Sequence, residues 1–269
     1  GTTSQVSRVQ LIFHHFRRMR LLELGNNGSI ERSETTLLER TVENEWRGIV
    51  HDCLYQTAKP VDQHPYLRNY LSMVRRAPLT VNYNFDDTIQ NLLDEEQIEG
   101  RDENVRGFET VWDSTVQFRY STCVLYHPNG FLPREIYRGP SPRLVFLEDS
   151  FADQLIDAQR GHYATLLSHF YRYTSLLVGL SLEDATLKHL LRQSAQTNPG
   201  HVHYYVAFTP GAAPSPDRER AIRDANFNTY NLDALFLTPD ELGALGRLVA
   251  ATDVEFASLA DEAGNPESY

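Results

Sequence analysis

The sequence predicts an α/β fold in which a mostly parallel β-sheet is covered by helices on both faces. Two observations lead to this prediction. Short apolar runs typical of buried strands alternate along the chain with longer segments whose apolar residues recur at helical spacing. The chain is also long enough, at 269 residues, to bury a full hydrophobic core. Strands that alternate with helices form parallel sheets, because each connection must cross back over the sheet.

The strand around which the other elements are organised is expected at 79–84. Leu79, Val81 and Tyr83 alternate there with polar residues, which is the two-residue period of an extended chain. Further strands are expected at 122–126, 144–147, 175–179 and 202–208, with a short sixth strand at 235–237. Helices are expected at 5–24, 33–58, 66–75, 88–93, within 148–171, around 187–191, and at 218–230 and 239–250. The acidic stretch 94–103 is predicted to be a solvated loop.

Composition excludes several classes of protein. A net charge of −11 argues against direct binding of a nucleic-acid backbone as the main role, because that binding needs a basic surface. The two cysteines, Cys53 and Cys123, are too few for a zinc ribbon and suit a reducing cytoplasm, which is the expected location. No apolar run reaches the length of about 18 residues that indicates a membrane span, and residues 1–4 lack the pattern of a signal peptide.

Polar residues gather where three of the expected strands end. They are Asn84 and Asp86 after the first strand, His127 after the second, and Gly179, Ser181 and Asp184 after the strand at 175–179. Each also has an ordinary structural explanation, because Asn and Asp form turns, histidine is common in loops, and serine caps helices. Since α/β sheets bind ligands at the carboxyl ends of their strands, we interpret the three positions together as a ligand site.

Three motifs resemble, in their order and spacing, those of the sirtuin-like domains of bacterial defence systems. They are YNFDD at 83–87, YHPNG at 126–130 and LVGLSLED at 177–184, and the resemblance covers roughly residues 60–250. It implies a Rossmann-like fold that binds NAD, with Asn84 and His127 as the catalytic pair. It also implies that Asp86 contacts the nicotinamide-ribose end. Gly179 and Ser181 would contact the ribose and phosphates, with Tyr83 and Asp184 also among the NAD-binding residues.

The chain departs from this family at its beginning. The family opens with a strand and a Gly-Ala-Gly-x-Ser phosphate loop, and we interpret residues 1–4 as the end of that loop. The first strand and most of the phosphate loop are therefore expected to be missing. Residues 1–76 are predicted to be the helical part of the domain, 77–255 the NAD-binding and catalytic part, and 256–269 a tail.

The function that the resemblance implies is hydrolysis of NAD+ to nicotinamide and ADP-ribose, with NAD as substrate and no metal. The family further implies an abortive-infection antiphage effector, activated by homo-oligomerisation or by a sensor subunit that is nucleic-acid-guided or an ATPase. Three alternatives remain open at this point. The domain could sense NAD or a cyclic ADP-ribose derivative without hydrolysing it, could be a protein deacylase, which the cysteine count disfavours, or could be a structural subunit with a degenerate site.

Overall fold

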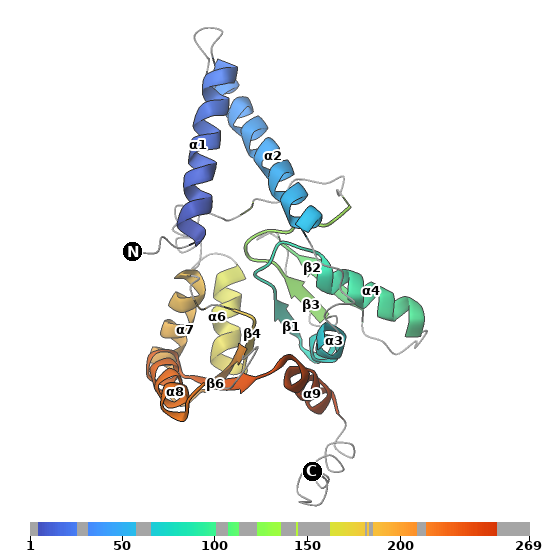
Figure 1. Cartoon of the computed structure of the whole chain (residues 1–269), viewed down its shortest axis with the longest axis vertical. Coiled ribbons are helices and arrows are strands. Elements are labelled where there is room, and N and C mark those ends of the chain that lie inside the picture. The colour runs from blue at the N-terminus through green and yellow to red at the C-terminus, as the bar shows by residue number, and fades with distance from the viewer. Residues whose placement is uncertain are drawn as a thin grey trace, which may run out of the picture.

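The computed structural model describes residues 5–25, 32–57, 66–100, 107–112, 123–135, 144, 162–180, 182, 185–208 and 214–251. Its helices are α1 (Gln5–Gly25), α2 (Arg32–Thr57), α3 (Tyr66–Arg76), α4 (Thr88–Gly100), α6 (His162–Arg172), α7 (Ala185–Thr197), α8 (Pro216–Tyr230) and α9 (Pro239–Ala250) (Figure 1). The strand predicted at 144–147 and the first part of the helical region predicted from 148 lie outside the described residues, apart from Leu144.

The described strands form two three-stranded sheets, and every strand pair is parallel. The first sheet has the order β1 (Leu79–Val81), β3 (Cys123–Tyr126), β2 (Phe108–Val111). The second has the order β4 (Leu176–Val178), β5 (His203–Phe208), β6 (Leu232–Leu237). Because helices connect these parallel strands, the predicted α/β, Rossmann-like class is confirmed.

Helices cover both faces of the first sheet, as the alternation along its central strand requires. All four residues of β3 are buried. Cys123 and Leu125 point to the face covered by α3 and α4, where they pack with Leu71, Leu92 and their neighbours. Val124 and Tyr126 point to the other face, where they pack with residues of α6 and α7 such as Leu166 and Leu190. A strand buried on both faces reads as a continuous apolar run, which is why 122–126 was recognisable.

The second sheet joins the first through shared apolar side chains. Phe170 of α6 contacts both the cluster under β1 to β3 and the cluster of β4, α7 and β6. On the opposite side, Met73 of α3 packs with Val206 of β5 and Leu242 of α9. The two sheets therefore share one hydrophobic interior. Tyr83, in the segment that follows β1, packs against the cluster of the second sheet, and this contact helps to position the loop after β1.

Two elements differ from the sequence-based prediction. The first is β2, a strand that was not predicted, because Phe108–Val111 is short and only half of it is apolar. The second is α4, which continues to Gly100, so the stretch 94–100 is helical and the predicted loop was wrong there. Its acidic residues are compatible with the helix because Glu95 and Glu96 pair with Arg68 and Arg75 of the neighbouring α3.

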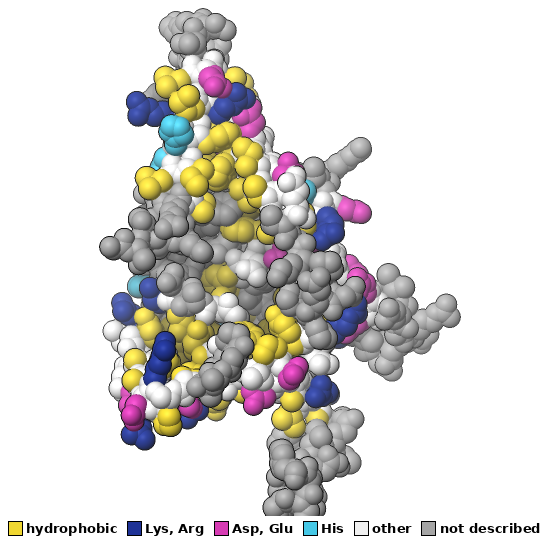
Figure 2. Space-filling view, viewed as in Figure 1, with side chains coloured by type: hydrophobic (Ala, Val, Ile, Leu, Met, Phe, Trp, Pro, Cys, Tyr) yellow, Lys and Arg dark blue, Asp and Glu magenta, His cyan; other side chains and the backbone are white. Residues whose placement is uncertain are grey.

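The first two helices form a hairpin that projects from the rest of the molecule (Figure 1). Phe13 of α1 packs on Trp46 of α2, and Arg20 pairs with Glu45. Hydrophobic side chains nevertheless gather on the visible face of this hairpin (Figure 2). Among the leucines of its two helices, Leu11 and Leu37 are 65% and 63% exposed. No described helix combines the length and the apolar character that a membrane span requires.

Candidate functional site

The carboxyl ends of β1, β2 and β3 meet at one edge of the first sheet, as their parallel register requires. The sheet ladder continues past the strands, because the Asn82 amide donates to the Tyr126 carbonyl and the His127 amide donates to the Val111 carbonyl. A further bond, from the Leu132 amide to the Phe85 carbonyl at 2.7 Å, holds the two outgoing segments side by side. The loops predicted to carry the site are therefore in direct contact.

His127 lies at the centre of this edge with no exposed surface. Its Nδ1 is 2.8 Å from the backbone carbonyl oxygen of Asn84, and its Nε2 is 2.7 Å from the amide nitrogen of Gln90. The ring of Phe131 lies 4.7 Å away, centroid to centroid. In this state, both ring nitrogens of His127 are occupied by groups of the chain itself.

These partners determine the protonation state of His127. A carbonyl oxygen only accepts hydrogen bonds, so Nδ1 must carry a proton and donate to Asn84. Burial lowers the pKa of the imidazole and favours its neutral form, against the smaller raising effects of the Asn84 bond and of the Asp86 and Asp87 carboxylates. The neutral ring has its lone pair at Nε2, where the Gln90 amide donates. His127 is therefore a neutral histidine with a defined tautomer.

Asn84 differs from His127 in that its side chain is exposed to solvent. Its backbone amide donates to the Asn82 side chain at 3.0 Å, which forms a local turn, and within the described part of the chain its own carboxamide makes no hydrogen bond. Asn84 and His127, the catalytic pair that the resemblance implies, are joined through the Asn84 backbone carbonyl. The side chain of Asn84 is exposed, whereas the imidazole is buried.

Two other predicted NAD-binding residues have structural partners. One oxygen of Asp86 accepts from the Thr88 amide at 3.0 Å, so this side chain caps the beginning of α4. Tyr83 packs against the cluster that contains Leu177 and Leu191, and its carbonyl accepts from the Asn129 side chain. The turn-forming explanation of the Asp86 side chain thus holds, whether or not it also contacts a ligand.

The third predicted motif is described only in part. Gly179 follows β4 with a φ of +69° and is exposed, and no atom of the described residues lies within 4 Å of the position of a Cβ. A backbone of this kind suits glycine and leaves space for a ligand to approach. Ser181 and Asp184 lie outside the described residues.

Three residues of the site were not predicted: Gln90, Asp87 and Tyr55. Asp87 is buried and accepts from the Tyr55 hydroxyl at 3.0 Å and from the Arg134 amide at 2.7 Å, so it ties α2 to the loop after β3. Gln90 had a recognisable signal, because it is a polar residue among the apolar positions of a helix that packs on the sheet. The hydrogen bond between Tyr55 and Asp87 joins residues that are distant in sequence, and no local pattern of the sequence indicates it.

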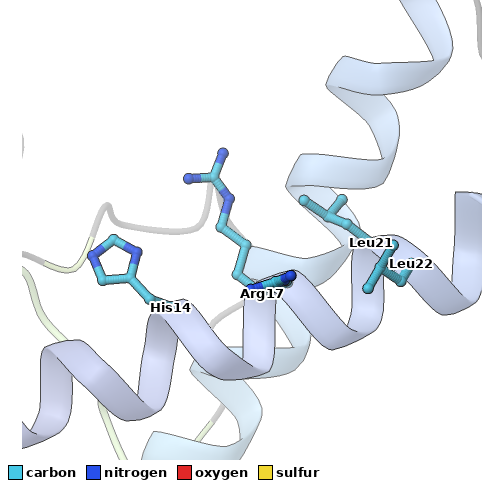
Figure 3. A pocket seen from close by; sticks show the side chains of 5 residues that line it. His14, Arg17, Leu21 and Leu22 are labelled. Carbon is cyan, nitrogen blue, oxygen red and sulfur yellow. The ribbon is translucent and has the colours of Figure 1, made fainter.

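A surface pocket of about 360 Å³ lies elsewhere, along α1 of the helical hairpin (Figure 3). It is lined by His14, Arg17, Arg18, Leu21 and Leu22, all from α1, so a single helix forms its walls. This pocket does not coincide with the strand ends. No group of three or more His, Cys, Asp or Glu side chains suitable for a metal ion occurs among the described residues.

Parallel sheets flanked by helices place this protein in the class of α/β domains that bind ligands at the carboxyl ends of their strands. Residues 78–235 match the family model of the SIR2-like domain, which is more than half of the 269-residue chain. The chain therefore belongs to the SIR2-like family. Domains of this family bind NAD, and an NAD-related activity is the one that the family assigns to this chain. No curated protein matches the sequence.

Proposed function

We propose that this protein hydrolyses NAD+ to nicotinamide and ADP-ribose. The observation that carries the proposal is the contact between Asn84 and His127 at the carboxyl ends of β1 and β3, inside the SIR2-like region. Two features fit a dinucleotide substrate at this edge. The Asn84 carboxamide is exposed where a ribose would lie, and the left-handed Gly179 leaves open space at the end of β4.

In this proposal, Asn84 and His127 act on the bond between the ribose and nicotinamide. The C1′–N bond breaks and its electron pair leaves with nicotinamide, which departs as a neutral molecule. The oxygen of a water molecule held by the Asn84 carboxamide bonds to C1′, and its proton passes to Nε2 of His127, whose neutral ring can act as a general base. Asp86 would orient a ribose hydroxyl with the oxygen that does not cap α4, and Gly179, Ser181, Asp184 and Tyr83 would line the cofactor.

The proposal includes an inactive state, because Nε2 of His127 is occupied by Gln90 in this structure. We therefore propose that hydrolysis begins only after a rearrangement, triggered by oligomerisation or by a sensor subunit. Loss of cellular NAD on such a trigger would make the protein an abortive-infection antiphage effector. The exposed apolar side chains of the α1–α2 hairpin are a suitable surface for such a partner.

The experiment that tests the hydrolase is nicotinamide release from NAD+ by the purified protein, followed by chromatography. Asn84→Ala and His127→Ala should each reduce the rate by about 10²–10⁴, the usual effect of losing a general base or its partner. Asn91→Ala and His189→Ala change exposed residues of α4 and α7 and should leave the rate unchanged. If His127→Ala keeps the wild-type rate while remaining folded, the proposed role of this histidine is wrong.

A second candidate is a module that senses NAD or a cyclic ADP-ribose derivative without hydrolysing it. The complete burial of His127 favours this candidate, because a residue that never contacts the ligand need not be accessible. Calorimetric binding of NAD with no nicotinamide release, even at high protein concentration, would support sensing over hydrolysis. A zinc-ribbon deacylase is disfavoured because the chain has only two cysteines, of which Cys53 is exposed on α2 and Cys123 is buried in β3.

A further inference from the structure

We propose that Gln90 caps the lone pair of His127 and so holds the base of this site in a resting state. The effect of this cap on activity rests on the hydrolase function proposed above. The cap itself is a hydrogen bond between Gln90 and His127, and it can be measured without a substrate. Gln90 touches no substrate in this scheme and acts only through His127.

The direction of the hydrogen bond between Gln90 and His127 is set by the group on the other side of the ring. The Asn84 carbonyl requires the proton on Nδ1, so the neutral ring presents its lone pair at Nε2, and only an N–H group can satisfy it. The Gln90 amide nitrogen lies 2.7 Å away in the required position. The orientation of the Gln90 amide therefore follows from the carbonyl on the opposite side of the ring.

The Gln90 amide lies close to a second group besides His127. Its nitrogen also lies 3.5 Å from the Thr110 hydroxyl oxygen on β2, at the outer limit of a hydrogen bond, and its side-chain oxygen is buried with no hydrogen-bond partner among the described residues. Leaving a buried amide oxygen unpaired is unfavourable. In the reverse orientation this oxygen would face Nε2 and could accept only from a protonated His127, and the NH2 group would then take the position that has no partner.

The contact between His127 and Gln90 is buried away from solvent. His127 has no exposed surface and Gln90 is buried, so water does not replace the amide at Nε2 in this state. A general base needs that lone pair for the proton of the attacking water. In an active form, either Gln90 must move away from Nε2 or the ring of His127 must rotate away from Gln90. Gln90 lies in the first turn of α4, the helix that begins directly after Asp87.

The test begins with the wild-type chain labelled with ¹⁵N at histidine, with the His127 signals identified by their loss in His127→Gln. Long-range ¹H–¹⁵N NMR shows which ring nitrogen carries the proton, and a titration gives the pKa of the ring. At neutral pH we expect a proton on Nδ1 and a hydrogen-bonded, unprotonated Nε2. A proton on Nε2 in place of Nδ1 overturns the proposal without any substitution at Gln90.

Two substitutions then change the cap in opposite ways. Gln90→Met removes the donor and keeps the volume, whereas Gln90→Glu supplies an acceptor in place of a donor. Since a hydrogen bond to the lone pair favours the neutral ring, the pKa of His127 should rise in Gln90→Met, and should rise further beside the Gln90→Glu carboxylate. It should not change in Gln193→Met, which alters an exposed glutamine on α7.

An unchanged pKa of His127 in folded Gln90→Met contradicts the cap. If thermal melting shows that Gln90→Met does not fold, Gln90→Glu decides the question, because a carboxylate at this position must raise the pKa of His127 and an unchanged pKa contradicts the cap. The carboxylates of Asp86 and Asp87, the two charged groups that act on this ring, are present in every variant and do not alter the comparison.

Nicotinamide release from NAD+ by the same samples tests the consequence for activity. Removing one hydrogen bond from the resting state should raise the basal rate roughly fivefold in Gln90→Met. Gln90→Glu should abolish release, because a protonated imidazole accepts no proton. A basal rate in Gln90→Met equal to or below wild type overturns the resting-state role. No release by any protein contradicts the hydrolase instead, and the NMR result still decides whether the cap exists.

Discussion

The two histidines that are buried among the described residues, His127 and His203, favour the neutral ring because burial lowers their pKa values and because an N–H group donates to one ring nitrogen of each. His127 receives the Gln90 amide at Nε2, and His203, at the beginning of β5, receives the Ser175 amide at Nδ1, 3.2 Å away. Both are almost completely inaccessible to solvent. His127 belongs to the candidate site and follows the carboxyl end of β3. His203 is the first residue of β5, at the amino end of its strand, and supports the fold.

The environment of His203 predicts a dependence of stability on pH. Burial, with a smaller contribution from His201, lowers the pKa of His203 from the ordinary value of 6.5 to about 4. The unfolded chain therefore binds an extra proton between these values, and stability is lost as the pH falls from 6.5 towards 4. The titration of His203 lowers the free energy of unfolding by about 3 kcal/mol over this window, because each unit of pKa corresponds to about 1.4 kcal/mol.

The measurement is urea unfolding of the wild type and of His203→Asn at several pH values between neutral and about 4. Asparagine can accept from the Ser175 amide but does not titrate, so the variant should lose less stability on acidification. His189→Asn, at an exposed position on α7, should follow the wild-type slope. Identical slopes for His203→Asn and the wild type would mean that His203 titrates normally in the folded protein.

At the residue scale, the sequence predicted the positions of Asn84 and His127 but not their relation. Their neighbourhood followed from general rules, because both come directly after parallel strands and such strands end at one edge. The roles of individual atoms did not follow. The Asn84 carbonyl, rather than its side chain, contacts the imidazole, and Gln90 reaches His127 from a helix. Contacts of this kind depend on the angle at which α4 packs on the sheet.

At the scale of elements, the closest helix packing is between α3 and α9. Gly246 of α9 lies so near α3 that a Cβ at this position would be 2.6 Å from the Asn69 carbonyl oxygen, and the Ser72 hydroxyl donates to the Gly246 carbonyl at 3.1 Å. Gly243, one turn earlier, would place a Cβ 2.9 Å from the Asn69 side-chain nitrogen. The first contact is with fixed backbone, whereas the second is with a side chain that can turn away.

Gly246→Ala should therefore lower the free energy of unfolding by about 1–3 kcal/mol, the usual effect of overpacking, because α9 must move away from α3. Gly243→Ala should be much less harmful, and both variants receive the same small benefit of alanine in a helix. Urea unfolding monitored by circular dichroism compares the two. Equal stability of the two alanine variants would show that the α3–α9 contact can relax without loss.

The elements that the sequence predicted well were those with clear boundaries or a continuous apolar run. The α1 and α2 helices were found nearly at their observed bounds because glycine and asparagine follow the first and a proline follows the second, and β3 is a buried run of four residues. By contrast, β2 has one fully buried residue, Val111, and its pairing with β3 supplies the rest of its stability. The C-terminal half of α4 is acidic and is supported by ion pairs from α3, which no local pattern reveals.

At the scale of the whole molecule, α2 connects the projecting hairpin with the candidate site. Near its C-terminal end, the Tyr55 hydroxyl lies 3.0 Å from the Asp87 carboxylate after β1 and 2.5 Å from the Leu132 carbonyl after β3, and its one proton is shared between them. The Arg134 guanidinium lies over the Tyr55 ring at 5.2 Å. His51, one turn earlier, contacts the Pro133 carbonyl at 3.2 Å. A partner that displaces the hairpin would thus act directly on the loop that carries His127.

Tyr55→Phe tests this connection, because it removes one hydroxyl and retains the ring. Asp87 is buried and would lose the partner of one carboxylate oxygen, so the free energy of unfolding should fall by about 1–3 kcal/mol. Hydrogen exchange should accelerate at the Leu132 and Arg134 amides, which bond to Phe85 and Asp87, while the amides of β5 keep their wild-type rates. Tyr171→Phe, whose hydroxyl bond to Thr197 is exposed, should change neither region. If exchange at Leu132 and Arg134 is unaffected by Tyr55→Phe, α2 does not hold this loop, and a signal from the hairpin must reach His127 by another route.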